Sequence, residues 1–478
     1  MPFSPKVYRR RRQRLLDALG EGLLLLPTAP QTLRNGDVHH PFRAGSDFHY
    51  LTGFHEPEAL LAAWRTGPGR HRAELFVLPR DREREIWDGR RVGAERAPRL
   101  FGVDAAHPIA SLAEQLVRLL AGHARLFHRL GVDPALDRML FSAFARRAEK
   151  QRRANPAAHP AILDPYPEIA RLRLCKDADE VACLERAAAV TAAGHRAAMR
   201  AARPGRYEYE VQAELEAAFR RGGAMREGYP SIVASGPNAC ILHYRENDRR
   251  MRRGELLLLD AGAEVDMYTA DVTRTLPVGG TFSEAQRKVY ALVLRAQKAA
   301  IAAVAPGAPW NAPHRAAVRV LTQGLVDLGV LPRRPAATLI EKGAYRPYYM
   351  HGTSHWLGLD VHDAGAYQDA DGKPVRLEPG MVLTIEPGLY FQPGDRTVPR
   401  ALRGIGVRIE DDVLVTAAGR RVLTEAIPKE IADVEAACAA IETQDAVSAK
   451  RTAAVAADAR RVRRQAAKRR TAPRAARR

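Results

Sequence analysis

Short apolar runs separated by polar turns characterise the N-terminal part of the chain. LLLLP, EALLAAW and AELFVLP are continuous apolar runs of the kind that form buried strands. DFHYLTGF is interpreted as another strand-like segment, ended by Gly53. In SLAEQLVRLLAGH the spacing becomes helical, with leucines at positions 112, 116, 119 and 120. These patterns predict a domain that mixes short strands and helices.

A proline-rich stretch divides the chain. Residues 155–167, NPAAHPAILDPYP, carry four prolines and form the best candidate for a linker. After it, Asp177 and Glu180 have the spacing of a helix-capping pair, so we expect a helix from there through Met199. A second helix is expected over residues 207–221, where two glycines follow.

The order of elements then repeats. Strand signals, interrupted once, cover residues 231–278, and Ser283 with Gln286 then forms a capping box in front of a long helix. One more helix is expected over residues 311–328, and strand signals return over residues 351–416. Two helices followed by strands therefore occur twice. This order favours a duplicated α+β half-unit, although the letters themselves contain no clear repeat.

Length and composition agree with two domains. The 478 residues exceed one ordinary core, and 46% of them are hydrophobic. No apolar run approaches the roughly 20 residues of a membrane span, and the first segment, MPFSPKVYRRRRQRLL, lacks the apolar core of a signal peptide. Four scattered cysteines without CxxC spacing indicate reduced thiols. We therefore expect a cytoplasmic protein without a membrane contact.

The net charge of +20 raises the alternative of nucleic-acid binding. Half of this excess lies in the last 34 residues, where twelve basic residues accompany two acidic ones. This Ala/Arg-rich tail has almost no large apolar residues, so we expect it to be disordered or marginally helical. A nucleic-acid or membrane-surface contact through the tail is the less favoured interpretation.

Two aspartates in ELLLLDAGAEVDMYTADVTRTLPV form the first candidate metal site. Asp260 and Asp271 are symmetric about the bond between Val265 and Asp266. A hairpin turning there places them directly opposite each other, with Cβ atoms roughly 5 Å apart. Two carboxylates that close repel each other, and a cation between them removes the repulsion. Exposed hairpin acids are the alternative, which the apolar neighbours of both residues disfavour.

Three histidines lie within twelve residues in HGTSHWLGLDVHD. The HxxxH spacing of His351 and His355 matches helical zinc ligands, but the segment lacks the catalytic glutamate of such motifs. Its glycines also favour a loop leading into a strand. We expect one metal ligand among His351, His355 and His362, and we expect the other two imidazoles to contact the ligands or the substrate.

Two further carboxylates complete the candidate set. Glu386 ends the apolar run in LTIEPGLY, where Pro387 stops the strand and leaves the carboxylate at its end. Arg408 and Glu410 alternate with apolar residues in GVRIEDD, a pattern that normally indicates a solvated face and that we expect here to line a cleft. Four carboxylates and one imidazole suit paired divalent cations better than zinc in a Cys/His cage.

Together, DAGAEVDMYTADVTRT, HGTSHWLGLDVHD, LTIEPGLY and GVRIEDD resemble aminopeptidase P. That family belongs to the pita-bread metallopeptidases, with the prolidases and methionine aminopeptidases. The similarity extends to IVASGPNACILHYREN, FRAGSDFHYLTGFHEPEA and WDGRRVG, and it reaches about Glu442. It implies an α/β (α+β) chain with a creatinase-like N-terminal domain over residues 1–168, a pita-bread catalytic domain over residues 169–442 and the basic tail over residues 443–478.

The resemblance also implies a role for each candidate residue. Two divalent ions, typically manganese, would be held by Asp260, Asp271, His355, Glu386 and Glu410. The substrate and the transition state would be surrounded by His243, His351, His362 and Arg408. The substrate pocket, or the wall that a neighbouring subunit adds to it, would include Tyr229, Asp37 and Trp87. A homo-oligomer, either a dimer or a tetramer, is implied as well.

The implied reaction is hydrolysis of the bond between an N-terminal residue and a following proline. Two ions lower the pKa of a bridging water, so that hydroxide forms near neutral pH. Glu386 accepts the proton and passes it to the leaving nitrogen, while His243 or His362 stabilises the oxyanion. A prolidase, which cleaves only Xaa-Pro dipeptides, shares the ligand set and is the nearest alternative. A non-catalytic pita-bread binding module is disfavoured, because such modules lose ligands.

Overall fold

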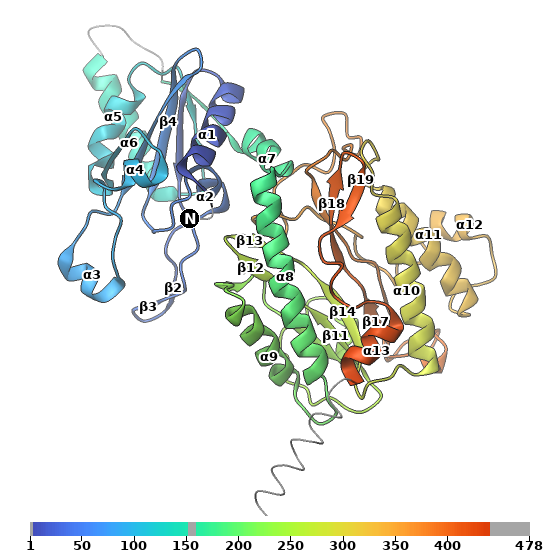
Figure 1. The fold of residues 1–478 in the computed structure, drawn as a ribbon. Helices are drawn as coiled ribbons and strands as arrows, with labels where there is room; N and C mark the ends of the chain where they lie inside the picture. The colour runs from blue at the N-terminus through green and yellow to red at the C-terminus, as the bar shows by residue number, and fades with distance from the viewer. Residues whose placement is uncertain (1–2, 152–158, 440–478) are drawn as a thin grey trace, which may run out of the picture.

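Two domains joined by helix α7 (Tyr166–Leu174) make up the structure, a computed structural model that describes residues 3–151 and 159–439 (Figure 1). The basic tail, for which disorder is expected from the sequence, lies outside the described residues. Residues 155–158 of the proposed linker lie outside them too.

The N-terminal domain is built on a mixed six-stranded sheet with the order β6–β5–β4–β1–β7–β8. Its strands are β1 (Leu23–Pro27), β4 (Leu60–Gly67), β5 (Arg70–Val77), β6 (Ala105–Pro108), β7 (Arg125–Phe127) and β8 (Ala161–Leu163). The first three are the strands expected from LLLLP, EALLAAW and AELFVLP, so those predictions are confirmed. β8 falls within the expected linker, where the letters AIL pair with β7 in parallel instead of forming a loop.

Alternation along β1 gives this sheet two apolar faces. Leu24 packs in a core with helices α1 (Pro5–Leu19) and α2 (Ser46–Thr52). Leu23 and Leu25 pack on the other face, in a core with helices α5 (Leu112–Leu120) and α6 (Pro134–Gln151). α5 buries the four leucines whose spacing predicted a helix, so that prediction is also confirmed.

The segment DFHYLTGF, in contrast, is not strand-like, because it forms α2. Its residues 48–52 are all buried, and a short helix buried on every side has no 3.6-residue pattern to reveal it. Gly53 does end the segment, with φ of 69°. A Cβ at Gly53 would lie 2.4 Å from the Tyr8 ring, so the close packing of α1 on α2 also requires glycine there.

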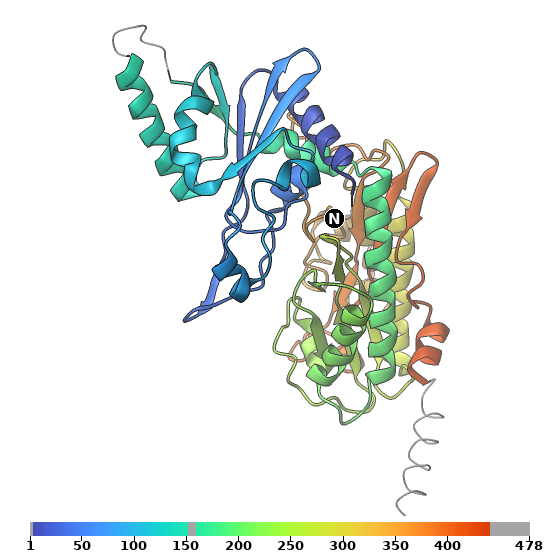
Figure 2. The same cartoon turned by 60° about the vertical axis from the view of Figure 1, so that its left-hand side comes forward.

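Two projections extend from one end of the N-terminal domain (Figures 1 and 2). One is the hairpin of β2 (Leu33–Asn35) and β3 (Val38–His39), and the other is helix α3 (Arg82–Asp88). Both carry exposed large apolar side chains, namely Leu33, Val38, Ile86 and Trp87. The domain is completed by α4 (Ala97–Phe101) and the short turn η1 (Ile109–Ser111).

Long helices cover the strands of the C-terminal domain (Figures 1 and 2). They are α8 (Ala178–Ala201), α9 (Glu208–Arg221), α10 (Glu284–Ala302) and α11 (Ala312–Asp327), and shorter helices follow at α12 (Ala336–Glu341) and α13 (Ile431–Ala439). The four long helices match the predicted ones. Both capping boxes form as well: Asp177 caps α8 through the Glu180 N–H at 3.0 Å, and Ser283 caps α10.

The strands of this domain come in two sets, each after a helix pair. The first set is β9 (Arg226–Glu227), β10 (Ile232–Ser235), β11 (Leu256–Asp260), β12 (Ala263–Val265), β13 (Tyr268–Thr269) and β14 (Thr273–Pro277). The second set is β15 (Val382–Ile385), β16 (Gly388–Tyr390), β17 (Gly406–Arg408), β18 (Asp411–Thr416) and β19 (Gly419–Val422). The predicted order of two helices and then strands is thus confirmed.

Strand content is lower than the sequence indicated in two places. Residues 236–240 form a short 3-10 turn, η2, after β10, and η3 (Arg400–Leu402) precedes β17. Residues 351–381 contain only isolated bridges, such as that between Trp356 and Leu383. The segment with the three histidines is therefore a loop, as its glycines indicated.

The hairpin from β11 to β14 carries the two candidate aspartates. Its turn residues Asp266 and Met267 have φ of 53° and 72°, the left-handed conformation of a type I′ turn. The register pairs Asp260 with Thr273, so the prediction that Asp271 lies directly opposite Asp260 is wrong. The turn is centred one residue later than the symmetry of the letters indicated. Asp271 is two residues from Thr273, so both aspartates still share one face as diagonal neighbours.

A buried ion pair lies between the two domains. Arg11 of α1 contacts Glu180 of α8 at 3.3 Å, and both side chains are buried. The Tyr268 hydroxyl also donates to Glu180, at 2.8 Å, and the Arg11 guanidinium lies 4.3 Å from the centre of the Tyr50 ring.

Of the helices in the described ranges, none is both long and apolar enough for a membrane crossing.

Candidate active site

A cavity of about 460 Å³ opens in the C-terminal domain. It is lined by ten of the twelve candidate residues: Tyr229, His243, Asp260, Asp271, His351, His355, His362, Glu386, Arg408 and Glu410. Asp37 and Trp87 lie elsewhere, on the exposed β2–β3 turn and on α3, and 85% of the Trp87 side chain is exposed. The cavity of one chain therefore draws all its lining residues from the C-terminal domain.

The two aspartates meet at a tyrosine. The Tyr229 hydroxyl lies 2.7 Å from Asp260 Oδ1 and 2.5 Å from Asp271 Oδ1, so it joins the two carboxylates. Asp260 ends β11, and Asp271 lies just before β14. Gly262 is the residue opposite Asp271 in this register, and a Cβ there would lie 1.7 Å from the Ala270 carbonyl oxygen. The absence of a side chain at Gly262 lets the two strands approach.

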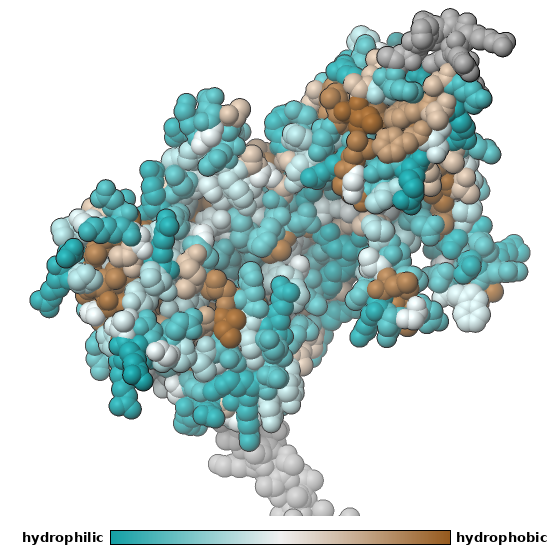
Figure 3. All heavy atoms as spheres, turned by 180° about the vertical axis from the view of Figure 1, so that it is seen from behind, coloured by the Kyte–Doolittle hydropathy of each residue, from teal (hydrophilic) through white to brown (hydrophobic). Residues whose placement is uncertain are grey.

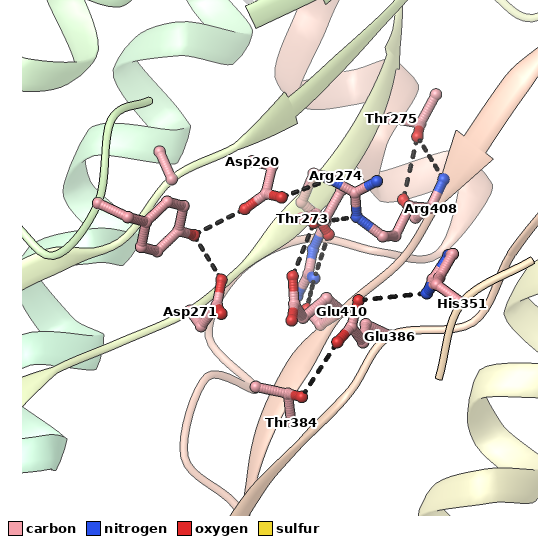
Figure 4. Close-up of polar contacts among 12 residues, drawn as sticks. Asp260, Asp271, Thr273, Arg274, Thr275, His351, Thr384, Glu386, Arg408 and Glu410 are labelled. Atoms are coloured by element: carbon pink, nitrogen blue, oxygen red, sulfur yellow. Dashed lines mark hydrogen bonds and ion pairs between the residues drawn. The ribbon is translucent and has the colours of Figure 1, made fainter. Parts of the chain in front are cut away.

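The other three predicted ligands lie on the side of Asp271 formed by the second set of strands and the loop before it, and Figure 4 shows two of them, Glu386 and Glu410. His355 Nε2 lies 3.2 Å from Asp271 Oδ2 and 3.6 Å from Glu386 Oε1. Glu410 follows β17 and accepts a hydrogen bond from the Thr273 hydroxyl at 2.7 Å. Asp271, His355 and Glu410 each have one potential ligand atom, and these three atoms lie within 4.8 Å of one another.

Arg408 and Glu410 are not on a solvated face. Arg408 is 4% exposed and Glu410 is 2% exposed, so the alternating pattern lines a buried cleft as expected. Arg408 donates to Asp260 Oδ2, to the Thr273 hydroxyl at 2.9 Å and to the Tyr390 hydroxyl at 3.1 Å. Arg408 is thus a fixed positive charge at one side of the acidic cluster.

Burial sets the electrostatics of the cluster. It raises the pKa of Glu386 to about 7, against the opposing effects of His355 and Arg408. Burial and the nearby charges of Asp271 and Glu386 raise the pKa of Glu410 well above its ordinary value. Burial lowers the pKa of His355, but its hydrogen bond to Asp271 and the Glu386 charge outweigh burial and raise it to about 9. Carboxylates buried together without compensation thus hold protons that exposed ones would lose.

This donor set fits divalent cations. A hard cation accepts oxygen ligands from several carboxylates and one imidazole nitrogen. Its charge also opposes the two effects that raise the pKa values of Asp271, Glu386 and Glu410, namely burial and the mutual repulsion of the carboxylates. A closely spaced Asp–His–Glu triad together with buried carboxyl groups of raised pKa is typical of a site built for a cation.

The remaining histidines take different positions around the cluster. His351 Nε2 is 2.8 Å from the Tyr390 hydroxyl, and burial followed by the Arg408 charge lowers the pKa of His351 to about 3, so this imidazole is neutral. His362 packs edge-on against His355, with ring centroids 4.5 Å apart. His243 is exposed at the cavity wall.

Sequence reasoning missed three polar residues behind the candidate ligands. Thr273 links Glu410 to Arg408, Tyr390 links Arg408 to His351, and Asp412 accepts from the Asp271 N–H at 3.1 Å. Thr273 had a signal, since it lies two residues after Asp271 on the same strand face. Asp412 and Tyr390 had none beyond their closeness in sequence to Glu410 and Glu386.

Comparison with known proteins assigns the chain to a family. The profile of metallopeptidase family M24 matches residues 182–417, and that of the aminopeptidase P N-terminal domain matches residues 8–127. The Xaa-Pro aminopeptidase of Haemophilus influenzae is 45% identical over 412 residues, which is 86% of this chain and 92% of that protein. That of Escherichia coli is 42% identical over 443 residues, which is 92% of this chain and 99% of the relative. The chain belongs to the aminopeptidase P family.

Solved structures give the same assignment. Aminopeptidase PepP of Pseudomonas aeruginosa superposes with a TM-score of 0.89 at 45% identity, covering 92% of this chain and 99% of that one. Escherichia coli aminopeptidase P with the inhibitor Pro-Leu gives a TM-score of 0.88 at 41% identity, with the same coverage. The N-terminal aminopeptidase P domain followed by the pita-bread domain, expected from the sequence motifs, is therefore confirmed.

Proposed function

We propose that this aminopeptidase P family member hydrolyses the bond between an N-terminal residue and a following proline, using two divalent ions. The observation that carries the proposal is the buried cluster of Asp271, His355 and Glu410, with Asp260 and Glu386 beside it in one cavity. The named activity of relatives more than 40% identical over most of the chain supports the substrate class.

The five ligands divide into two sides of the cavity. We propose that Asp260 and Asp271 on the hairpin would hold the ions from one side and that His355, Glu386 and Glu410 would hold them from the other. Manganese is the ion we propose, since an oxygen-rich set with one imidazole suits it. When bound, the ions supply a water of lowered pKa and polarise the scissile carbonyl.

Glu386 is the proposed proton carrier. Without metal, its pKa is raised to about 7, mainly by burial. With the ions in place, its carboxylate would accept a proton from water and release it to the leaving proline nitrogen. The Thr384 hydroxyl lies 3.4 Å from Glu386 Oε1 and also accepts from the His355 N–H at 3.1 Å, so it holds these two groups in register. A ligand that also shuttles protons must be fixed in this way.

Neutral and charged groups around the cavity divide the remaining tasks. His243 and His362 are the proposed donors to the oxyanion, since an imidazole N–H stabilises negative charge that develops in the transition state. His351, held neutral beside Tyr390, would contact the pyrrolidine ring. Arg408 donates to Asp260 and holds its carboxylate in place. The Tyr229 hydroxyl joins the carboxylates of Asp260 and Asp271.

The prolidase alternative differs in whether the substrate continues beyond the proline. The E. coli relative was solved with the inhibitor Pro-Leu, and this dipeptide is the product that cleavage of Xaa-Pro-Leu would release. That correspondence favours an enzyme that accepts residues after the proline. We therefore propose peptides longer than Xaa-Pro dipeptides as substrates.

One experiment tests the proposal. The full chain, stripped with EDTA and reloaded with Mn²⁺, is assayed on Ala-Pro-Phe, Ala-Ala-Phe and Ala-Pro. Fast, metal-dependent release of alanine from Ala-Pro-Phe alone is the expected result. Hydrolysis of Ala-Pro alone would favour the prolidase alternative over the proposal. Turnover that persists after EDTA has removed the metal would rule out the metal-dependent mechanism.

Self-association is proposed through the N-terminal domain. The β2–β3 hairpin and α3 expose Leu33, Val38, Ile86 and Trp87, and exposed apolar side chains on projections are typical of contact surfaces. Figure 3 shows further apolar side chains gathered on the N-terminal domain. In a dimer or tetramer, Asp37 and Trp87 of one subunit would reach the cavity of its neighbour. Sedimentation of the wild type and of Trp87→Ala tests this contact.

Two broader proposals come from composition. All four cysteines are free, which fits the reducing cytoplasm as the compartment. The basic tail is proposed as dispensable for peptide hydrolysis, so deleting residues after 442 should leave turnover unchanged. Any contact with nucleic acid would then be a separate property of the tail, lost in high salt.

A further inference from the structure

The loop that carries His362 has no regular secondary structure of its own. Residues 357–363 come after the ligand His355 and contain neither helix nor strand. Gly358 must stay without a side chain, because a Cβ there would lie 2.3 Å from an Asp363 carboxylate oxygen. The position of the His362 imidazole over the ligand cluster is therefore set by the contacts that anchor this loop.

Two carboxylates on either side of His362 provide the anchors. Arg173, on the connecting helix α7, donates to Asp360 Oδ2 at 2.8 Å and to Asp363 Oδ1 at 2.5 Å. Lys176 lies 3.0 Å from the other Asp363 oxygen. Arg173, Lys176 and Asp363 are all buried. Charge-assisted bonds in a buried setting are the strong class of hydrogen bond, so they hold the loop on both sides of the imidazole.

The N-terminal domain holds the same loop from a second direction. The Ser46 hydroxyl donates to Asp360 Oδ1 at 2.6 Å, and Arg43 Nη2 donates to the Leu359 carbonyl at 2.5 Å. Arg43 Nε also donates to Glu264 at 2.6 Å. Glu264 belongs to β12, within the hairpin that presents Asp260 and Asp271. One guanidinium thus ties the hairpin with two proposed ligands to the loop with His362.

We propose that Arg43, aided by Ser46, is a positioning residue that fixes His362 relative to the hairpin carrying Asp260 and Asp271. Among the described residues, the N-terminal domain adds no side chain to the cavity of its own chain, yet through Arg43 it sets the distance between the two walls of that cavity. Displacement of a catalytic donor by about 1 Å can cost about a hundredfold in rate. This inference rests on the proposed function, in which His362 donates to the oxyanion.

Four variants of the full, Mn²⁺-loaded chain separate positioning from general support of the fold. Arg43→Gln removes the link, and Arg43→Lys keeps the charge. Ser46→Ala removes the hydroxyl that donates to Asp360 and accepts from Arg43 Nη1 at 2.9 Å, and Arg10→Ala is the matched control. Arg10 also forms an ion pair across the domains, with Asp177 at 3.1 Å, but touches no part of the loop. Each is assayed for kcat and KM on Ala-Pro-Phe, metal content and thermal unfolding.

The expected result is a fall in kcat of about tenfold or more for Arg43→Gln, a smaller fall for Ser46→Ala, and partial rescue by Arg43→Lys, with KM and metal content unchanged. In a His362→Ala background, Arg43→Gln should cost less than about twofold further, because both changes disable the same donor. Equal losses in both backgrounds, or an equal loss in Arg10→Ala, would overturn the proposal.

If Arg43→Gln does not fold, Ser46→Ala is compared in the wild-type and His362→Ala backgrounds instead, so the inference stays testable. An inactive wild type would instead refute the proposed function, and the two failures are thus distinguishable.

Discussion

Glu386 combines two tasks in one side chain, at the end of β15. Its carboxylate faces His355, and burial raises its pKa to about 7, against an ordinary value of 4.5. A ligand must be ionised, whereas a proton carrier must change its charge state during each turnover. A carboxylate has two oxygens, so one can bind an ion while the other accepts and releases a proton. The pKa of about 7 describes Glu386 in the metal-free cluster.

Glu386→Gln should therefore stop turnover while leaving the fold intact. The amide keeps the shape and one oxygen but cannot carry a proton, so kcat should fall by about 10²- to 10⁴-fold. Stopped assays on Ala-Pro-Phe and metal analysis measure the effect. Glu378→Gln, an exposed glutamate just before the same strand, serves as the control and should keep its activity. A near-normal kcat in Glu386→Gln would contradict the assignment.

Stability of the metal-free protein should depend on pH in a set direction. The pKa of Glu386 is raised from 4.5 to about 7, so its stabilising contribution as a neutral group is present below 4.5 and is lost as the pH rises through about 7. The pKa of His355 is raised from 6.5 to about 9, so its stabilising contribution is present below 6.5 and is lost as the pH rises through about 9. Both effects lower the free energy of unfolding as the pH increases.

We therefore expect the EDTA-stripped protein to lose about 3 kcal/mol of stability between about pH 6 and about pH 9. Denaturant unfolding at both pH values measures the loss. The Mn²⁺-loaded protein is the control and should change far less, because a bound cation keeps the carboxylates ionised at both pH values. Metal-free protein that became more stable at the higher pH would contradict this account.

At the scale of single elements, the hairpin from β11 to β14 decides where the site forms. Its two strands present Asp260 and Asp271 on one face, and Gly262 lets them lie close. The turn at Asp266 and Met267 fixes the register, and a shift by one residue would turn an aspartate away from the cavity.

Gly262→Ala should separate the strands. The new Cβ would lie 1.7 Å from the Ala270 carbonyl oxygen, so the backbone has to move. Overpacking of this kind costs about 1–3 kcal/mol, and we expect a matching fall in the free energy of unfolding together with weaker metal binding. Gly394→Ala is the matched control, because a Cβ at Gly394 meets nothing within 4 Å. Equal stability and metal content in the two variants would be inconsistent with the close approach.

Elements with local signals were predictable from the sequence, and elements defined by distant contacts were not. The helices after Asp177 and Ser283 carry their caps within three residues, so α8 and α10 could be located closely. The register of the hairpin was misplaced, because its turn uses Asp266 and Met267 without the glycine that usually marks a type I′ turn. α2 was missed because burial on every side hides helical periodicity.

The candidate site divides in the same way. The carboxylates and histidines could be found because each occurs in an unusual sequence motif. The resemblance to aminopeptidase P then assigned them to one site. Tyr390 could not be found in this way, since its importance comes from its hydrogen bond with Arg408 across the fold. Thr273 had a signal in its position two residues after Asp271, but only its bonds to Glu410 and Arg408 give it a role.

At the scale of the whole molecule, the two domains depend on the buried pair of Arg11 and Glu180. The carboxylate also accepts from Tyr268, so three segments converge on one side chain. Removing one partner of a buried pair costs about 3–5 kcal/mol when the other charge is left without compensation. Arg11 also lies 3.7 Å from the Asp177 carboxylate, so about 3 kcal/mol, the lower end of this range, is expected here.

Glu180→Gln should lower the free energy of unfolding by about that amount. The change keeps the shape of the side chain and its place in the first turn of α8, so the loss reports on the charge. Chemical denaturation measures it, with Asp179→Asn, the exposed neighbour in the same turn, as the control. A Glu180→Gln protein as stable as the control would mean that the interface does not rely on this pair.

The proposed ligands are spread along the chain from Asp260 to Glu410, and the spread has a consequence for synthesis. The N-terminal domain emerges from the ribosome first and has its own sheet and one core built from its own residues. The growing chain then exposes Asp260 and Asp271 long before Glu410 has been made. A nascent chain halted between these points would present a half-built, acidic pocket to the ions of the cell. Secure metal retention therefore has to be a late event, reached only when the second set of strands closes on the first.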